Sequence, residues 1–252
     1  MADTAKRSAG TSPVALAGFG LAIVGAIVLA SSGFGYRLGW WPLGTGFNML
    51  KWGAYLGIGA GLICLLGLLV TRPGSRRGGF VLSLVGFVIA FTVFWMPYSE
   101  QRRAREVPAI HDITTDTQNP PQFVAVLPLR AGAPNTTVYG GPKIAALQEK
   151  AYPDIRTLVL PVAPAQAFDR ALAVAKALGW HIDAQDQSAG RIEATDTTFW
   201  FGFKDDIVIR VEAGASGGSR VDIRSVSRIG HSDIGTNARR IRKFLAAMKR
   251  SA

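Results

Sequence analysis

The sequence predicts an α+β protein in which an N-terminal bundle of three transmembrane helices precedes one soluble domain built on an antiparallel sheet. Three observations carry this prediction. Uncharged apolar runs cluster before residue 100, a proline-rich stretch follows, and the remaining chain places four strand patterns between two amphipathic helices. The predicted regions are 1–98 for the transmembrane part, 99–155 for an extended Pro-rich connector and 156–252 for the soluble α+β domain.

The three apolar runs are long enough to cross a bilayer. They cover about residues 14–31, 52–70 and 80–96, and none contains Asp, Glu, Lys, Arg or His. At about 1.5 Å of rise per residue, each helix approaches the roughly 30 Å thickness of the hydrocarbon layer. The first run exceeds the apolar stretch of about 7–15 residues in a cleaved signal peptide, so we expect it to be retained.

Small residues recur every four positions in the first two runs. This spacing lets helix backbones approach closely in lipid, either within one bundle or between two copies of the chain, and we favour packing within the bundle. The runs offer few polar groups at membrane depth, which is typical of an anchor and not of a transport pathway. The small residues are Gly18, Ala22, Ala26 and Ala30 in the first run and Gly53, Gly57 and Gly61 in the second.

The net charge of +11 is concentrated beside the apolar runs. Residues 1–106 carry +7 and residues 107–252 carry +4. Basic residues beside membrane helices set topology and meet anionic headgroups, so the sequence predicts membrane lipids as partners and no nucleic acid.

Orientation follows weakly from the same charges. With the N-terminus inside, the inner and outer flanks carry five basic residues each, Lys6 and Arg7 among the inner ones. The short loop 71–79 packs three arginines into nine residues, and large domains translocate largely regardless of charge. We therefore expect a multi-pass membrane protein with its N-terminus inside and its soluble domain on the outer side.

For the soluble domain, the sequence predicts the element order β-α-β-β-β-β-α. We expect a strand at 157–161, a helix from Pro164 that Gly179 ends, strands at 180–184, 190–203, 206–213 and 219–228, and a helix at about 233–250. A curved antiparallel sheet packed against two helices is a helix-grip-like arrangement. In the connector, the sequence PPQFVAVLPLR suggests a short edge strand, and KIAALQEK suggests two helical turns.

The last helix shows an apolar stripe and a basic stripe. Ser232 or Asp233 is a natural N-cap. The apolar stripe predicts the buried face, and the basic stripe predicts the outer one. The first consists of Ile234, Ala238, Ile241, Leu245 and Met248, and the second of Arg239, Arg240, Arg242 and Lys243.

Two long motifs in the soluble domain resemble a known family. GRIEATDTTFWFGFKDDIVIRV and GSRVDIRSVSRIGHSDIGTNARRIRKFL, with HDITTDTQNPPQF and AYPDI upstream, are similar to the domain-of-unknown-function family 1499 over residues 108–250. The three apolar runs are similar to the anchors of its bacterial membrane-bound members. The resemblance implies an envelope-associated bacterial protein, so with this orientation we expect a multi-pass protein of the bacterial inner membrane with its soluble domain on the periplasmic side. The resemblance carries over no catalytic residues.

Aromatic residues around position 200 are one candidate binding patch. In FWFGF not every ring can point inward on a strand with two faces, so at least one is expected to be exposed. We predict that Trp200, Phe201 and Phe203 contact a ligand or a partner. The alternative is core packing beside a charged turn.

A second candidate lies where the last strand meets the last helix. Arg224, Arg228, Ser232 and Asp233 offer guanidinium groups and a helix start that together can hold an anion. The alternative, which we favour, is a network of ion pairs and a helix cap.

Few residues of the sequence point to catalysis or to a bound cofactor. Cys64 is the single cysteine, the three histidines lie far apart, and HDITTD is typical of turn chemistry, so we expect no metal and no cofactor. We expect a membrane-anchored binding or accessory module of the cell envelope, with an envelope protein or an anionic or lipid ligand as its partner. Two alternatives stay open: a hydrolase using Asp196, Asp205 and His231, and a structural subunit of an envelope complex.

Overall fold

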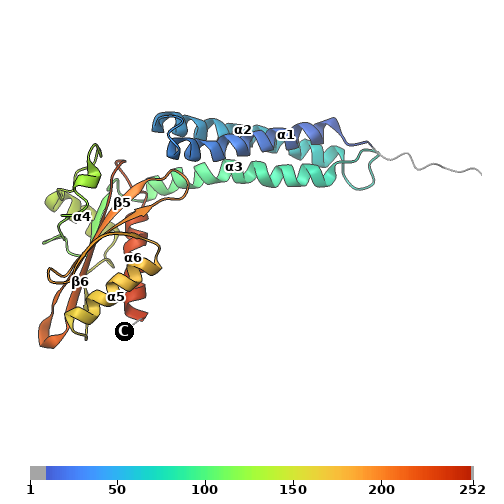
Figure 1. Ribbon diagram of the computed structural model, residues 1–252. Helices are drawn as coiled ribbons and strands as arrows, with labels where there is room; N and C mark the ends of the chain where they lie inside the picture. Colours follow the sequence, from blue (N-terminus) through green and yellow to red (C-terminus); the bar gives the residue numbers. More distant parts are fainter. Residues whose placement is uncertain (1–9, 251–252) are drawn as a thin grey trace, which may run out of the picture. The chain divides into compact units, whose positions relative to one another are not determined.

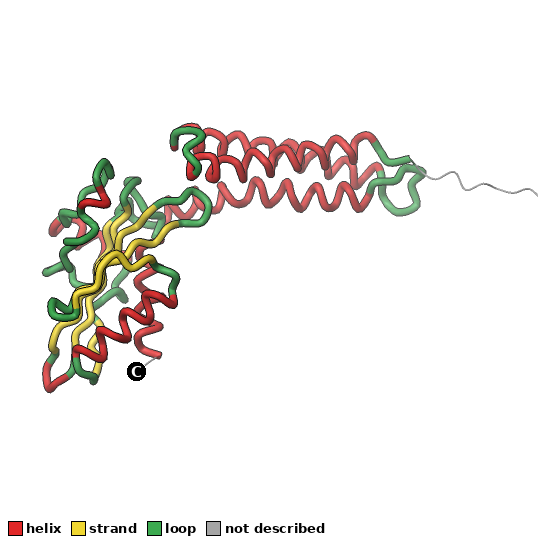
Figure 2. The backbone as a smooth tube through the Cα atoms, in the orientation of Figure 1, coloured by secondary structure: helices red, strands yellow, loops and turns green. Residues whose placement is uncertain are grey.

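The computed structural model describes residues 10–250, which fall into two units (Figures 1 and 2). The first unit contains the chain up to Arg102 together with Trp200–Gly202, and the second contains Arg103–Phe199 and the chain from Phe203 onward. Lys6 and Arg7, which the orientation prediction counts, lie outside the described residues.

Three helices form the first unit, and each is long and apolar enough to cross a membrane. They are α1 (Pro13–Arg37), α2 (Leu43–Val70) and α3 (Phe80–Glu106), of 25, 28 and 27 residues. At about 1.5 Å per residue they exceed the roughly 30 Å hydrocarbon thickness, which confirms the predicted apolar helices.

The helices extend beyond the predicted apolar runs because polar flanking residues continue the helical hydrogen bonding. The clearest case is α3, which passes through Pro97 and ends ten residues after the predicted end at 96. A proline removes one backbone hydrogen bond, and membrane helices tolerate this loss where neighbouring groups compensate.

Small residues bring the helices into close contact. A Cβ atom added at Gly57 would lie 2.9 Å from the carbonyl oxygen of Ala90, and one at Gly18 would lie 2.8 Å from Cys64 Sγ. Ala22 and Ala60 complete a buried cluster with Ala90. The predicted small-residue spacing therefore packs helices within one chain.

The second unit is an α+β domain, as predicted. Its strands form one antiparallel sheet in the order β1-β6-β5-β4-β3, and β2 also pairs with β6. Its elements are β1 (Asp112–Thr114), η1 (Pro128–Arg130), α4 (Gly141–Ala151), β2 (Leu158–Leu160), α5 (Pro164–Ala177), β3 (His181–Asp186), β4 (Arg191–Thr197), β5 (Lys204–Ala213), η2 (Ala215–Gly217), β6 (Ser219–Ser227) and α6 (Thr236–Arg250).

Helices α5 and α6 cover one face of the sheet (Figure 1). The alternation of β5 and β6 points Ile209 and Ile223, which are partners across the two strands, into this core. From the helices, Phe168, Ile241 and Phe244 meet them, all almost fully buried. This layer is the part of the domain that sequence periodicity predicts best.

The connector folds onto the opposite face of the sheet. Phe123 and Val126 pack against Val208 and Val226 there. The carboxylate of Glu193, which is fully buried, accepts hydrogen bonds from the backbone N–H groups of residues 124, 125 and 126 at 2.9, 3.0 and 3.0 Å. These N–H groups therefore bond to a side chain and not to a strand, which explains why the edge strand suggested by PPQFVAVLPLR does not form.

The connector contains one predicted and one unpredicted element. The helical turns suggested by KIAALQEK form α4, whereas strand β1, which was not predicted, pairs with β6 and lies beside α4. The side chain of Gln148 on α4 accepts from Thr114 N at 2.9 Å and donates to Thr114 O at 2.6 Å, so it extends the hydrogen bonding of β1. Elsewhere, β4 ends at Thr197 and not at 203, and α6 begins at Thr236 and not at 233.

One arginine ties the connector to the sheet. Arg224 is fully buried and donates from Nε and Nη2 to the two oxygens of Asp112 at 2.9 and 2.7 Å. Its guanidinium group lies over the rings of Phe123 and Tyr139, at 5.3 and 5.5 Å from their centroids. Burial and the nearby Asp112 charge raise the pKa of Tyr139 to about 12, so its hydroxyl stays neutral.

Replacing Arg224 with Ala leaves the Asp112 carboxylate buried without its cation. We expect the free energy of unfolding of the second unit to fall by about 3–5 kcal/mol. Urea unfolding of the detergent-solubilised protein, followed by near-ultraviolet circular dichroism, measures this change. Arg220→Ala, at an exposed position on the same strand, is the control, and an equal small loss in both variants would contradict the role given to Arg224.

Candidate functional site

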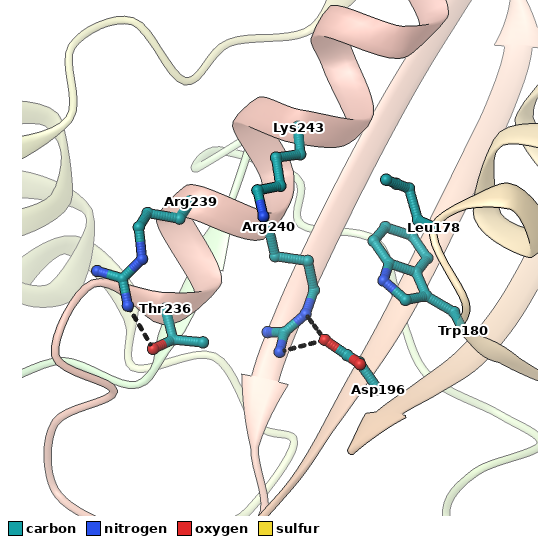
Figure 3. A pocket seen from close by; sticks show the side chains of 7 residues that line it. All are labelled: Leu178, Trp180, Asp196, Thr236, Arg239, Arg240 and Lys243. Atoms are coloured by element: carbon teal, nitrogen blue, oxygen red, sulfur yellow. Dashed lines mark hydrogen bonds and ion pairs between the residues drawn. The ribbon is translucent and has the colours of Figure 1, made fainter. Parts of the chain in front are cut away.

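A small pocket opens between α6 and the end of β4 (Figure 3). Its volume is about 190 Å³. This is below the roughly 300–1,000 Å³ of pockets for drug-sized ligands, so it suits one chemical group or a small molecule. The residues that line it are Leu178, Trp180, Asp196, Thr236, Arg239, Arg240 and Lys243.

The wall formed by Leu178 and Trp180 follows from how α5 ends. Gly179 has φ of +82°, the left-handed conformation that stops a helix, and it turns the chain toward β3. Trp180 is only 6% exposed and stacks on Phe244 of α6, with ring centroids 5.7 Å apart. The edge of the indole that carries the ring nitrogen faces the pocket in Figure 3. Within residues 10–250 this N–H has no hydrogen-bond acceptor.

Two carboxylates meet beneath the pocket because of the sheet register. Asp196 on β4 and Asp205 on β5 are direct partners across the strands, and Asp205 is only 3% exposed. Like charges placed opposite each other repel, so this pair needs a cation. Arg240 supplies it, with Nε 2.9 Å from Asp196 Oδ2 and Nη2 2.6 Å from Asp205 Oδ2.

The remaining donors of Arg240 are also used. Its Nη1 donates to Ser225 Oγ at 3.1 Å and to Asn237 Oδ1. The side chain of Asn237 in turn donates to Ser227 Oγ at 3.0 Å. Arg240 is therefore a structural ion in the floor of the pocket, and its charge is already shared by two carboxylates.

The rim of the pocket carries cations from the same helix. Thr236, Arg239 and Lys243 follow one another at helical spacing along α6, so they line one side of the opening (Figure 3). Arg239 donates to Thr236 Oγ1 at 2.9 Å and to the carbonyl of Ile234 at 3.0 Å. Lys243 is exposed and has no ion-pair partner in the described part of the chain.

The turn before α6 contains two of the residues predicted to bind an anion. Asp233 accepts from Gly235 N at 2.8 Å and from Asn237 N at 2.6 Å, and Ser232 Oγ accepts from Ile234 N at 3.2 Å. Burial raises the pKa of Asp233, although the two backbone hydrogen bonds act in the opposite direction. Both side chains serve the turn and the helix start, and neither lines the pocket.

The two predicted arginines lie on the opposite face of the sheet. Arg224 is buried with Asp112, as described above. Arg228 donates to both oxygens of Asp206, at 2.7 Å to Oδ1 and 2.9 Å to Oδ2, and to the carbonyl of Leu129 at 2.8 Å. Their donors are occupied by the fold, which corresponds to the ion-pair alternative and not to an open anion site.

The three predicted aromatic residues are also separate from the pocket. Trp200 and Phe201 belong to the first unit, where Trp200 Nε1 donates to the carbonyl of Ala30 at 3.0 Å and Phe201 is 6% exposed. Phe203 belongs to the second unit and accepts from Thr198 N at 2.9 Å, closing the turn between β4 and β5. A binding role for these rings stays a prediction.

Comparison with known families identifies the second unit. The family model described as "Protein of unknown function (DUF1499)" matches residues 112–248. The chain belongs to the DUF1499 family. This confirms the resemblance seen in the sequence motifs. The pocket lies wholly within the matched region. A search of curated proteins found no significant match.

Sequence reasoning missed the pocket of this DUF1499 domain for an identifiable reason. It placed Arg240 on the outer face of the last helix with Arg239 and Lys243, which is wrong, because Arg240 is only 6% exposed and points to the sheet. Asp196 and Asp205 require a cation if they lie opposite each other, but the sequence does not show the register of β4 and β5 that places them so.

The site offers hydrogen-bond donors and a single partly exposed carboxylate. Within residues 10–250 no three His, Cys, Asp or Glu side chains gather as metal ligands, so the described chain supplies no donor set for a metal ion here. Of the residues in the hydrolase alternative, Asp196 and Asp205 meet at Arg240, whereas His231 is exposed and does not line the pocket. The arrangement favours binding over proton transfer.

Substitutions of the two neighbouring cations should separate structure from binding. We expect Arg240→Gln to lower the free energy of unfolding by about 3–5 kcal/mol, because it leaves a buried carboxylate without its cation. Lys243→Gln removes an exposed, unpaired cation and should change the same free energy by no more than about 0.5 kcal/mol. Urea unfolding of both variants tests this contrast, and a large loss with Lys243→Gln would show that Lys243 has a structural partner.

Proposed function

We propose that this DUF1499 protein is a membrane-anchored binding module of the bacterial cell envelope, which holds a small ligand in the pocket beside Trp180. One observation carries the proposal. The pocket is formed by the fold itself, yet two of its donors, Trp180 Nε1–H and Lys243 Nζ, have no partner within residues 10–250, whereas the adjacent Arg240 is fully paired.

The ion pairing at Arg240 supports binding over hydrolysis. A general base must have an oxygen within hydrogen-bond reach of the proton that it removes. Oδ2 of Asp196 and Oδ2 of Asp205 already accept hydrogen bonds from Arg240, and Asp205 is only 3% exposed. The third alternative, a structural subunit, requires no pocket, and the open donors favour the binding module over it.

The three apolar helices support anchoring in the inner membrane by several passes. The arginine-rich loop at 71–79 and the tolerance of translocation for large domains support a periplasmic location for the second unit. Membrane lipids are then its immediate surroundings. The second partner of the module is an envelope protein.

Filling the pocket should remove the ligand. We expect native mass spectrometry of the mildly detergent-extracted protein to show an adduct, and Leu178→Trp to lose it because the larger ring occupies the pocket. Val159→Trp places the same ring at a position 67% exposed on β2, outside the pocket, and should keep the adduct. A wild-type spectrum without any adduct, or an equal adduct in all three proteins, would contradict the binding function.

A fusion at the C-terminus tests the proposed orientation separately. A reporter that is active only outside the cytoplasm, fused after Ala252, should be active, because the second unit follows an odd number of apolar helices from an inner N-terminus. The same reporter fused within the loop at 71–79 should be inactive. The reverse pattern would place the domain in the cytoplasm and leave the pocket to be tested with cytoplasmic ligands.

A further inference from the structure

We infer that the pocket beside Trp180 binds a phosphate monoester group, with the phosphate on the Lys243 and Arg239 side and the attached carbon group against Leu178. This inference rests on the proposed binding function and adds the chemical class of the ligand. Four features of the pocket indicate this class.

The pocket has two open donors, Trp180 Nε1–H and Lys243 Nζ, beside one carboxylate oxygen, Asp196 Oδ1, that Arg240 leaves unpaired. Trp180 Nε1–H is a donor only, and Lys243 has three N–H bonds and no acceptor. Trp180 is 6% exposed, and the edge of its indole that carries the N–H faces the pocket, so a group bound there can accept from it. A ligand that accepts several hydrogen bonds from one group matches these donors, and an oxyanion does so.

The charge of the lining matches a dianion. At the rim, Arg239 and Lys243 contribute two positive charges that have no ion-pair partner in the described chain, whereas the charge of Arg240 is taken up by Asp196 and Asp205. A phosphate monoester carries about −1.5 to −2 charges at neutral pH, enough to pair with both rim cations. A carboxylate carries one negative charge.

A second cavity with cationic walls provides a comparison. Arg191 and Arg210 line a cavity of about 210 Å³ on the opposite face of the sheet. There Arg210 pairs with Asp116 and Asp222, each at 3.0 Å, and Arg191 pairs with Glu193 at 3.1 Å. The cations of that cavity are neutralised by the fold, whereas Lys243 is not.

An apolar surface adjoins the donors. Leu178 is half-buried beside the indole of Trp180, and both face the cavity in Figure 3. The cavity of about 190 Å³ is too small for a whole lipid or a drug-sized molecule, which need roughly 300 Å³ or more. It suits the phosphate and the first carbons attached to it, from a soluble ester or from a lipid headgroup.

Phenyl phosphate, inorganic phosphate and benzoate discriminate among the ligand classes. The probe is the indole N–H resonance of Trp180 in full-length protein in detergent, assigned by its loss in Trp180→Phe. We expect phenyl phosphate to shift this resonance and to bind at least about tenfold more tightly than benzoate, since a second charge-assisted hydrogen bond contributes about 1.5–3 kcal/mol. Inorganic phosphate should bind more weakly than phenyl phosphate, because it lacks the group that contacts Leu178.

Matched lysine variants locate the phosphate. Lys243→Gln should weaken phenyl phosphate binding by roughly tenfold or more, through the loss of a charge-assisted contact. Lys249→Gln removes another exposed lysine from the same helix, outside the pocket, and should leave the affinity unchanged. Equal effects of the two substitutions would show only a general charge effect and would overturn the assignment.

Nanodiscs distinguish the two sources of the same group. A shift of the Trp180 resonance in discs containing phosphatidic acid, which is a phosphate monoester, but not in discs containing phosphatidylglycerol, identifies a lipid headgroup. A shift that appears only on addition of phenyl phosphate identifies a soluble ester. Benzoate binding as tightly as phenyl phosphate, or no shift with any monoester, would overturn the ligand class. A persistent mass adduct that Leu178→Trp removes would still leave the binding function standing.

Discussion

Carboxylates buried in the sheet must each have a cation, and this constraint determines how both faces of the second unit are covered. On the helix-covered face, Arg240 of α6 joins Asp196 and Asp205. On the other face, Asp206 holds Arg228 and Arg130, the latter from η1. Leaving one such charge unpaired costs several kcal/mol, so α6 and the connector cannot slide along the sheet without a large loss of stability. The ion pairs therefore fix the position of the helix that forms the pocket rim.

The pocket is a consequence of this arrangement. Because Arg240 reaches down to the carboxylates, the residues one position before it and three positions after it on α6 remain at the rim. The indole of Trp180 is held by its stacking on Phe244 of the same helix. A rigid wall and a rim of cations are thus placed by contacts that are needed for folding. This is the kind of preorganisation that lowers the entropy cost of binding.

The parts of the fold that depend on local composition were predictable from the sequence. Uncharged apolar runs gave the three helices of the first unit, and alternation in β5 and β6 gave the buried strands of the core. The missed features depend on partners that are distant in the chain. Arg224 and Asp112 are separated by 112 positions, and Glu193 binds backbone groups 67 to 69 positions away. No local pattern in residues 120–130 indicates that a carboxylate from β4 replaces a neighbouring strand.

The same distinction explains why the predicted site residues and the pocket differ. A cluster of arginines near the end of a strand indicates anion binding only if its donors are open, and the sequence does not show whether they are. Arg224 and Arg228 are paired across the sheet, whereas Lys243, which the sequence placed on an ordinary outer helix face, has no acidic partner in the described chain. In a domain that pairs most of its buried and half-buried arginines with carboxylates, a donor left open beside the unpaired N–H of an indole is the stronger indication of a ligand. Charge that the fold does not use internally is available for binding, and here it lies at the mouth of a cavity that the fold has already formed.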